Sequence, residues 1–140
     1  MDADEIEALL ALDVPAHLAT TDNQGLPIVI PIWFLWTGQE FVMTSVAHRP
    51  HVRRLEARPV ASICVDVEDP ERADGQRPNR QVRASGTVAL SIDEQAVWTR
   101  RITEKYLRGP GRDHQVALRS ADRRVVLRLK PERLIALRSV

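Results

Sequence analysis

Short runs in which apolar and polar residues alternate make up most of the chain, and this period of two predicts a mainly β protein. About seven mostly antiparallel strands are expected, and the turn sequences DNQG and TGQ join the first three into a meander. The runs are AHLATT at 16–21, LPIVIPIWFLWT at 26–37, EFVMTS at 40–45, VASICVDV at 60–67, RQVRASGTVALS at 80–91, RRVVLRLK at 123–130 and RLIALRS at 133–139. A long antiparallel sheet usually closes to protect its edges, so the pattern favours a β-barrel.

Prolines and a glycine interrupt these strands. Pro27 and Pro31 lie inside the second run, and because proline cannot donate to a ladder, this strand should bend, bulge or lie at an edge. Gly86, in the middle of the run 80–91, predicts a bulge or a bend. Residues 68–79 contain no apolar run and are expected to form an exposed loop.

Two short helices are predicted in the first half of the chain. Asp2 and Glu5 have the spacing of a capping box, and the apolar stripe that follows ends at Pro15. The segment PHVRRLEA at 50–57 should form about two helical turns, because Pro50 suits the first helical position.

One longer helix is predicted late in the chain. Ser91 and Glu94 have capping-box spacing, and the sequence GPGRD at 109–113 ends the helix. Its apolar face is expected to consist of Val97, Trp98, Ile102 and Tyr106.

Length and composition fit an ordinary soluble protein. The chain has 140 residues, which predicts one domain over residues 1–140, with 44% hydrophobic and 28% charged residues. A net charge of +1 excludes a global basic field that would collect nucleic acid. The longest apolar run, IVIPIWFLW, is too short to span a membrane, so a cytoplasmic protein is expected. The single cysteine, Cys64, is expected to be a small buried core residue.

Several kinds of chemistry have no matching motif. The four histidines form no HxH or HExxH pattern, and a local role for His48 and His51 is favoured over metal ligation. There is no GxSxG nucleophile, no GxGxxG and no GxxxxGK[ST] phosphate loop. The sequence therefore predicts no metal site and names no catalytic residue.

One connection, HRPHVRRLEARP at 48–59, concentrates positive charge, with four arginines and two histidines against one glutamate. It follows a strand that ends in two hydroxyls, and it contains a predicted helix start, where acidic residues would be expected. Guanidinium groups, hydroxyls and helix N–H groups are all phosphate ligands. We therefore predict an anion site formed by Thr44, Ser45, Arg49, His51, Arg53 and Arg54.

Two alternatives to the anion site stay open. A charge run is often a solvated surface. Arginines also bind nucleic acid, although the acidic residues that balance the charge and the lack of interleaved aromatic residues disfavour that use.

The run PIVIPIWFLW at 27–36 is apolar on both strand faces, since Trp33 alternates with Pro31 while Trp36 alternates with Phe34. Both faces should therefore be covered. One can fill the barrel, and the other requires a second subunit or a flat aromatic ligand. Plain core and dimer packing explains any one of these residues equally well.

The ordered set HLATTDNQGLPIVIPIWFLW, EFVMTS with its basic turn, LEARPVASICVD, VRASGTVAL, KYLRG and VVLRLKPERL resembles the pyridoxamine 5'-phosphate oxidase-like split β-barrel superfamily. More narrowly, it is similar to the flavin/deazaflavin oxidoreductase branch. The resemblance covers residues 15–138 and implies a split β-barrel homodimer with FMN, or alternatively coenzyme F-420, at the subunit interface; haem is a less favoured alternative.

The resemblance also implies a site and an activity. The cofactor phosphate would lie at residues 44–54, and the ring would lie against the strand with Val29, Pro31 and Trp33. The expected function is an FMN- or F-420-dependent oxidoreductase that transfers a hydride between the cofactor and a small molecule. The alternative is a non-catalytic cofactor-binding or carrier protein. Neither nucleic acid nor membrane is an expected partner.

The chain departs from the family pattern at three places. His51 stands where many relatives have a lysine, and Arg54 stands where an asparagine is common. Leu134 to Leu137 occupy the region of a frequent tryptophan. His51 is charged only when protonated, so a phosphate contact there should weaken above about pH 6.5. FMN and F-420 both remain open.

Overall fold

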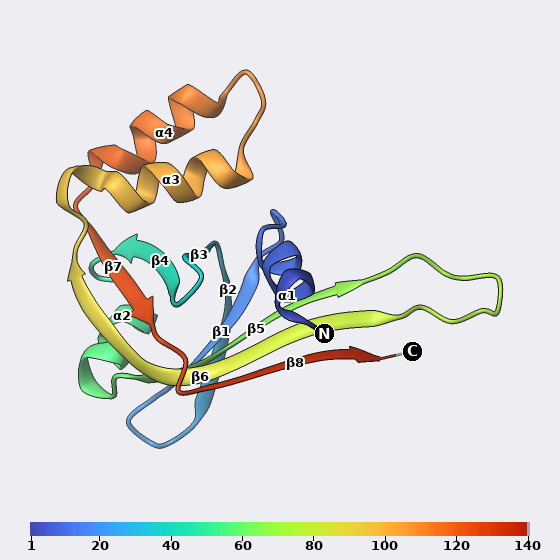
Figure 1. Cartoon of the computed structure of the whole chain (residues 1–140). Helices are drawn as coiled ribbons and strands as arrows, with labels where there is room; N and C mark the ends of the chain where they lie inside the picture. The colour runs from blue at the N-terminus through green and yellow to red at the C-terminus, as the bar shows by residue number, and fades with distance from the viewer. Residues whose placement is uncertain (140) are drawn as a thin grey trace.

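A computed structural model of the chain describes residues 1–139 and places eight β-strands and four α-helices in them (Figure 1). The strands are β1 Ala16–Thr21, β2 Pro27–Ile32, β3 Leu35–Trp36, β4 Phe41–Val46, β5 Val60–Glu68, β6 Asn79–Ile92, β7 Arg124–Leu129 and β8 Arg133–Ser139. The helices are α1 Ala3–Leu10, α2 Pro50–Ala57, α3 Val97–Tyr106 and α4 Arg112–Ala121, and a 3-10 turn at Glu94–Ala96 precedes α3.

The strands form one antiparallel sheet in the order β2-β1-β5-β6-β7-β4-β3, with β8 added alongside β6. The end strands β2 and β3 do not pair with each other, so the barrel is split rather than closed. The mainly β split barrel expected from the sequence is confirmed. Pro27 and Pro31 lie in β2, which is an edge strand, as their missing amide donors required.

The longest strand, β6, links the two halves of the barrel because it pairs with β5 at residues 79–87 and with β7 at residues 88–92. Figure 1 shows its strong curvature. The β5–β6 register is continuous through Gly86, so this glycine marks a bend and not a bulge. A Cβ at Gly86 would collide with the backbone oxygen of Lys130, and glycine alone permits this close approach.

The core fills the space between the curved sheet, α1 and α2. Two helices contribute fully buried side chains, Leu9 and Leu10 from α1 and Val52 and Leu55 from α2. The largest buried residues of the strands and their connections are Leu18, Phe34, Phe41, Met43, Ile63, Leu127 and Leu129. The predicted capping box of α1 is present, with reciprocal bonds of 2.8 and 2.9 Å between Asp2 and Glu5.

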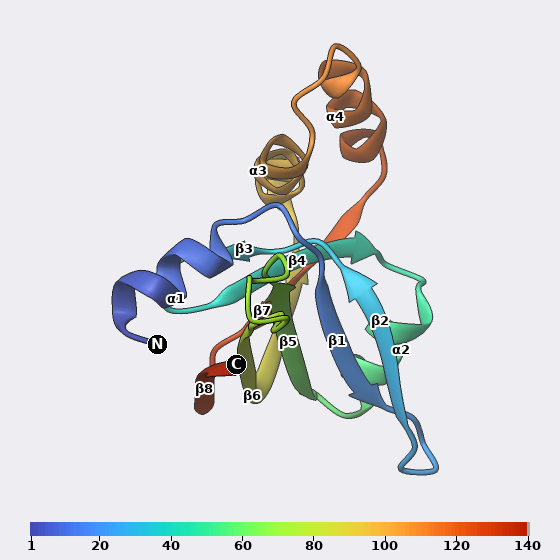
Figure 2. The same cartoon turned by 90° about the vertical axis from the view of Figure 1, so that its right-hand side faces the viewer.

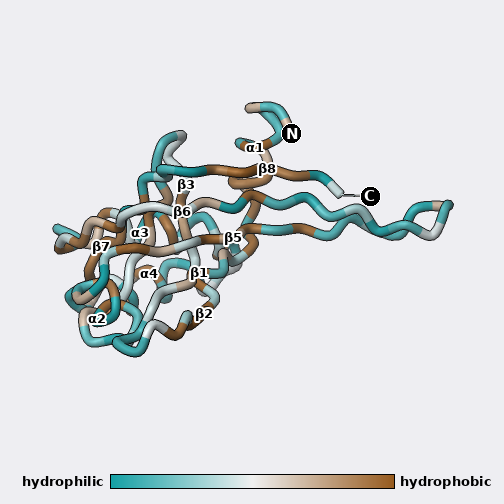
Figure 3. The backbone as a smooth tube through the Cα atoms, turned by 90° about the horizontal axis from the view of Figure 1, so that it is seen from below, coloured by the Kyte–Doolittle hydropathy of each residue, from teal (hydrophilic) through white to brown (hydrophobic). Residues whose placement is uncertain are grey.

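The predicted loop is confirmed as an exposed connection at residues 69–78, between β5 and β6. It forms the hydrophilic end of a two-stranded arm that reaches away from the barrel (Figures 1 and 3).

The predicted meander is present at both of its turns, because β1 pairs with β2 and β3 pairs with β4, but its middle strand is broken. The expected second strand breaks at Trp33 and Phe34, and β4 pairs with β3 and β7 and not with β2. The break has a physical cause at Phe34. Its N–H donates to the Tyr106 hydroxyl at 3.3 Å and its carbonyl accepts from Lys105 Nζ at 3.0 Å, so side chains of α3 replace a strand partner.

Two helix predictions also need correction. The capping box of Ser91 and Glu94 is not formed, since β6 continues to Ile92. Asp93 instead accepts bonds from the N–H groups of Trp98 at 3.1 Å and Thr99 at 2.9 Å, and it thereby caps α3. Helix α4 was not predicted. It has no buried residue and packs mainly on α3 (Figure 1).

Candidate functional site

A basic groove of about 400 Å³ opens where β2, β4, α2, α4 and β7 meet. Figure 2 shows α4 above the end of β4, with β2 and α2 on the same side of the barrel. Five of its eleven lining residues belong to the predicted site, namely Pro31, Thr44, Ser45, Arg49 and His51. The other six are Ile30, Ile32, Val46, Gln115, Arg119 and Arg124.

Three guanidinium groups give the groove its charge. Arg49, Arg119 and Arg124 form no ion pair with a carboxylate of residues 1–139. Burial and the neighbouring Arg119 lower the pKa of Arg124 below its usual value, an effect that Asp122 opposes. Unbalanced positive charge in a hollow is costly unless an anion offsets it, so the groove is suited to an anionic ligand.

His51 contributes a neutral imidazole. Burial is the main cause that lowers its pKa, and the charges of Arg54 and Arg49 lower it further. Its Nε2 is buried and has no hydrogen-bond partner among residues 1–139. The lowered pKa favours the uncharged imidazole at neutral pH.

The hydroxyls of Thr44 and Ser45 come from the last part of β4. Ser45 Oγ donates to the carbonyl of Val46 at 3.2 Å, and the hydroxyls of Thr44 and Thr99 lie 3.1 Å apart. The start of α2 supplies fewer free backbone N–H donors than its position beside the groove suggested. The N–H groups of Val52 and Arg53 already bond to the Arg49 carbonyl, so side chains are the main donors of the groove.

Four predicted site residues lie outside the lining of the groove. Val29 is 60% exposed and faces a different hollow. Trp33 is half-buried and contacts Arg119. Arg53 is exposed, whereas Arg54 donates from Nε to the Thr20 hydroxyl at 2.7 Å.

Sequence reasoning missed Gln115 and Arg119 because it missed α4. It also missed Arg124, although this residue begins β7 inside the predicted strand 123–130. A weak signal for the helix was present. Residues 112–121, RDHQVALRSA, contain neither glycine nor proline and are rich in good helix formers. Nothing local, however, relates α4 to the basic turn at 48–59, from which it is separated by more than fifty residues.

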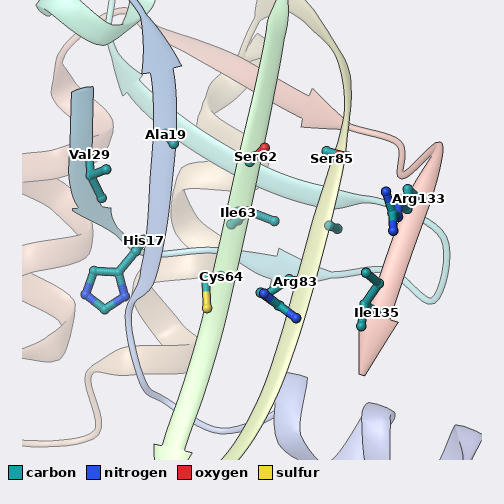
Figure 4. Close-up of a pocket in the computed structure, with 11 residues that line it drawn as sticks. His17, Ala19, Val29, Ser62, Ile63, Cys64, Arg83, Ser85, Arg133 and Ile135 are labelled. Carbon is teal, nitrogen blue, oxygen red and sulfur yellow. The ribbon is translucent and has the colours of Figure 1, made fainter. Parts of the chain in front are cut away.

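A second hollow of about 560 Å³ lies on the outer face of the sheet (Figure 4). We call it the outer hollow. His17, Cys64 and Arg83 are direct cross-strand neighbours there, on β1, β5 and β6. The expectation that Cys64 is buried in the core is wrong, since it lies half-buried on this face. Burial and Asp66 raise the pKa of its thiol, while Arg83 opposes the shift.

The basic groove and the outer hollow meet at the edge strand β2. Ile30 and Pro31 line the groove, whereas Val29 lines the hollow. Pro31 is the cross-strand partner of His17, which also lines the hollow. The groove and the outer hollow therefore share β2 as a common wall.

The architecture defines a class, the split β-barrels with a basic groove beside the turn from β4 to α2. Within that class, the chain belongs to the pyridoxamine 5'-phosphate oxidase family, whose sequence model matches residues 3–138. None of the curated proteins is significantly similar to this chain in sequence.

Solved structures are similar over nearly the whole chain. An F-420 reductase is 26% identical with a TM-score of 0.68, covering 92% of this chain and 94% of that one. A conserved hypothetical protein from Mycobacterium tuberculosis is 20% identical with a TM-score of 0.74, covering 97% and 84%. A FAD and haem binding protein from Mycobacterium smegmatis is 19% identical with a TM-score of 0.72, covering 96% and 70%. The last two likenesses concern the fold alone.

Within residues 1–139, every helix is too short or too polar to cross a membrane.

Proposed function

We propose that this protein binds FMN or coenzyme F-420 through its phosphate in the basic groove and acts as an oxidoreductase. The observation that carries the proposal is the set of three guanidinium groups, Arg49, Arg119 and Arg124, that share one groove without a carboxylate partner. The donor set fits a phosphate, because guanidinium forks and hydroxyls match phosphate oxygens. The family membership supports the same class of ligand.

The residues of the groove would divide the binding between them. Arg49 and the hydroxyls of Thr44 and Ser45 would bind phosphate oxygens from the β4–α2 side. Arg124, the cross-strand partner of Val46, would bind from the neighbouring strand β7, and Arg119 would bind from α4. His51 would add a hydrogen bond at neutral pH and a charge only after protonation. Arg53 and Arg54 lie outside the lining, so they would contribute positive potential rather than direct contacts.

The cofactor ring would lie along β2, against Val29, Pro31 and Trp33. Val29 and Pro31 are exposed on this edge strand, which separates the groove from the outer hollow. When bound, the ring would supply the hydride chemistry, and the protein would orient it and limit its contact with water. The small-molecule substrate would reach the ring from the side of the outer hollow.

We further propose a homodimer with the cofactor at the subunit interface. The outer face of β2, β1, β5, β6 and β8 exposes Val29 by 60% and Val60 by 53%. A second copy on this face would bury these apolar side chains. It would also cover the ring that lies over β2.

FMN is the first candidate because of the family, and the 26% identical F-420 reductase supports F-420 as the alternative. Absorbance spectra of the freshly purified protein, followed by calorimetric titration with FMN, F-420 and haem, test the proposal. We expect a submicromolar to micromolar Kd for one of the first two. Arg49→Gln should weaken this binding about 10-fold to 150-fold, since a hydrogen bond to a charged group contributes about 1.5–3 kcal/mol.

The matched control is Arg100→Gln, which removes an exposed arginine of α3 and should leave the Kd unchanged. A colourless protein that binds none of the three cofactors would overturn the proposal. Anaerobic reduction of the bound cofactor and its reoxidation by added acceptors separates an oxidoreductase from a carrier. A carrier would bind as tightly but show no acceptor-dependent turnover.

A further inference from the structure

Trp33 contacts two side chains from the helical pair α3–α4. The ring of Tyr106 stacks on the indole with a centroid distance of 4.6 Å and an interplanar angle of 3°. The guanidinium carbon of Arg119 lies over the same indole, 4.4 Å from the ring centroid. Stacked aromatic rings and a guanidinium over an indole are favourable contacts that fix the orientation of the groups.

The aromatic pair is itself held in place. The Tyr106 hydroxyl donates to the Val14 carbonyl at 2.8 Å and accepts from the Phe34 N–H at 3.3 Å. The neighbouring Lys105 donates to the carbonyls of Phe34 and Leu10 at 3.0 and 3.2 Å. The indole therefore stacks on a tyrosine whose hydrogen bonds join α3 to the segments before β1 and before β3.

Arg119 connects this aromatic pair to the basic groove. Its side chain lines the groove, and its Nε is buried without a hydrogen-bond partner among residues 1–139. Its backbone carbonyl accepts a 2.7 Å bond from Arg124 Nε, and Arg124 is another guanidinium of the groove. Helix α4 has no buried residue and packs mainly on α3, so the contact with Trp33 adds a link between this helix and the segment before β3.

We infer that Trp33 is a positioning residue for the anion site. Its indole holds the Arg119 guanidinium in the groove, and the Arg119 carbonyl in turn orients Arg124. This role rests on the proposed phosphate binding and is separate from the ring contact proposed above. A contact between Trp33 and the cofactor ring would change the affinity only for ligands that have a ring. The placement of Arg119 would also change the affinity for an anion that has no ring.

Calorimetric titration of the full chain with inorganic phosphate tests the inference. Trp33→Leu should weaken phosphate binding about twofold to thirtyfold, the range that corresponds to a cation–π contact. Trp33→Phe keeps an aromatic face and should recover part of the loss. The matched control is Trp98→Leu. The guanidinium groups of Arg101 and Arg128 lie over the Trp98 ring in the same way. Neither arginine lines the groove, so phosphate affinity should not change.

A double-mutant cycle separates positioning from a general loss of structure. Arg119→Gln should weaken phosphate binding, and adding Trp33→Leu should then change it little, because the tryptophan acts through the arginine. Arg119→Lys keeps the charge but not the planar group, so it should also weaken binding. If Trp33→Leu does not fold, the phosphate affinity of Arg119→Lys tests the positioning role instead.

The outcomes differ for the inference and for the anion site. Wild-type affinity in Trp33→Leu, or in Arg119→Lys, would overturn the positioning role while the anion site stands. Absence of phosphate binding by the wild-type protein would overturn the anion site and the positioning role together.

Discussion

Arg54 Nε donates a 2.7 Å hydrogen bond to the hydroxyl of Thr20 and so joins α2 to β1. Thr20 is only 2% exposed, so this hydroxyl has little access to water. Arg54 therefore stabilises the contact between α2 and β1, whereas its exposed neighbour Arg53 does not. The two arginines could not be distinguished from the sequence.

Arg54→Met should therefore lower the free energy of unfolding by about 1–2 kcal/mol, because it removes a charged donor from a buried hydroxyl. Arg53→Met, at an exposed position, should change it by less than about 0.5 kcal/mol. Urea denaturation of both variants measures the difference. Equal effects would show that the Thr20 contact does not stabilise the fold.

Gly86→Ala should destabilise the protein by about 1–3 kcal/mol, since the added methyl group would collide with the Lys130 carbonyl in a packed backbone. Gly109→Ala is the control. Its Cβ would meet no atom within 4 Å, so a change below about 0.5 kcal/mol is expected. Thermal and urea unfolding of the two variants gives the comparison, and equal stabilities would contradict the close approach.

His51 should make stability depend on pH below about 6.5. Burial, Arg54 and Arg49 lower its pKa in the folded protein, whereas in the unfolded chain it has the ordinary value of about 6.5. As the pH falls through 6.5, the unfolded state binds a proton that the folded state does not, and stability is lost. The His51→Gln variant should lose less stability in this range than the wild type. His48→Gln, at an exposed position in the same turn, should behave like the wild type.

Lys105 should make the free energy of unfolding depend on pH in the alkaline range. Burial lowers its pKa to about 8, and Asp13 opposes the shift. Between pH 8 and about 10.4 the unfolded state holds a proton that the folded state has lost, so the contribution of Lys105 to stability rises with pH. The difference in unfolding free energy between wild type and Lys105→Met should show this rise, and Lys130→Met should not. A difference that stays constant with pH would refute the lowered pKa.

Cys64 reports on the proposed dimer, because it faces the outer hollow. Its raised pKa predicts slow alkylation at neutral pH. If a second copy covers this face, alkylation should slow further as the protein is concentrated. A Cys64→Ser, Arg100→Cys variant, with its thiol on the exposed face of α3, should react at a rate independent of concentration. Equal concentration dependence in both proteins would argue against this interface.

Local signals in the sequence predicted most of the elements well. The capping box at Asp2 and Glu5 and the proline at position 50 mark helix starts that the structure reproduces. The strand period identified the barrel. It failed at Phe34, where the backbone bonds to Lys105 and Tyr106, residues more than seventy positions away. Such a contact leaves no local pattern.

The residues that line the groove also fall into two groups, those that local sequence predicted and those that it did not. Thr44, Ser45, Arg49 and His51 were predictable because they are close in sequence and share one turn. Arg119 could not be predicted, since it lies on a helix with no buried face. Two neighbouring arginines on α2 also had to be separated by geometry, because only the structure shows which one bonds to Thr20.

Strand β7 lies between β6 and β4 and begins at Arg124, a residue of the basic groove. Residues 112–124, which come late in the chain, therefore complete the lining of the basic groove. A nascent chain that still lacks residues 112–124 would have only eight of the eleven residues that line the groove. Anion binding should thus follow the synthesis of Arg124, and a bound anion should selectively stabilise β7 against local opening.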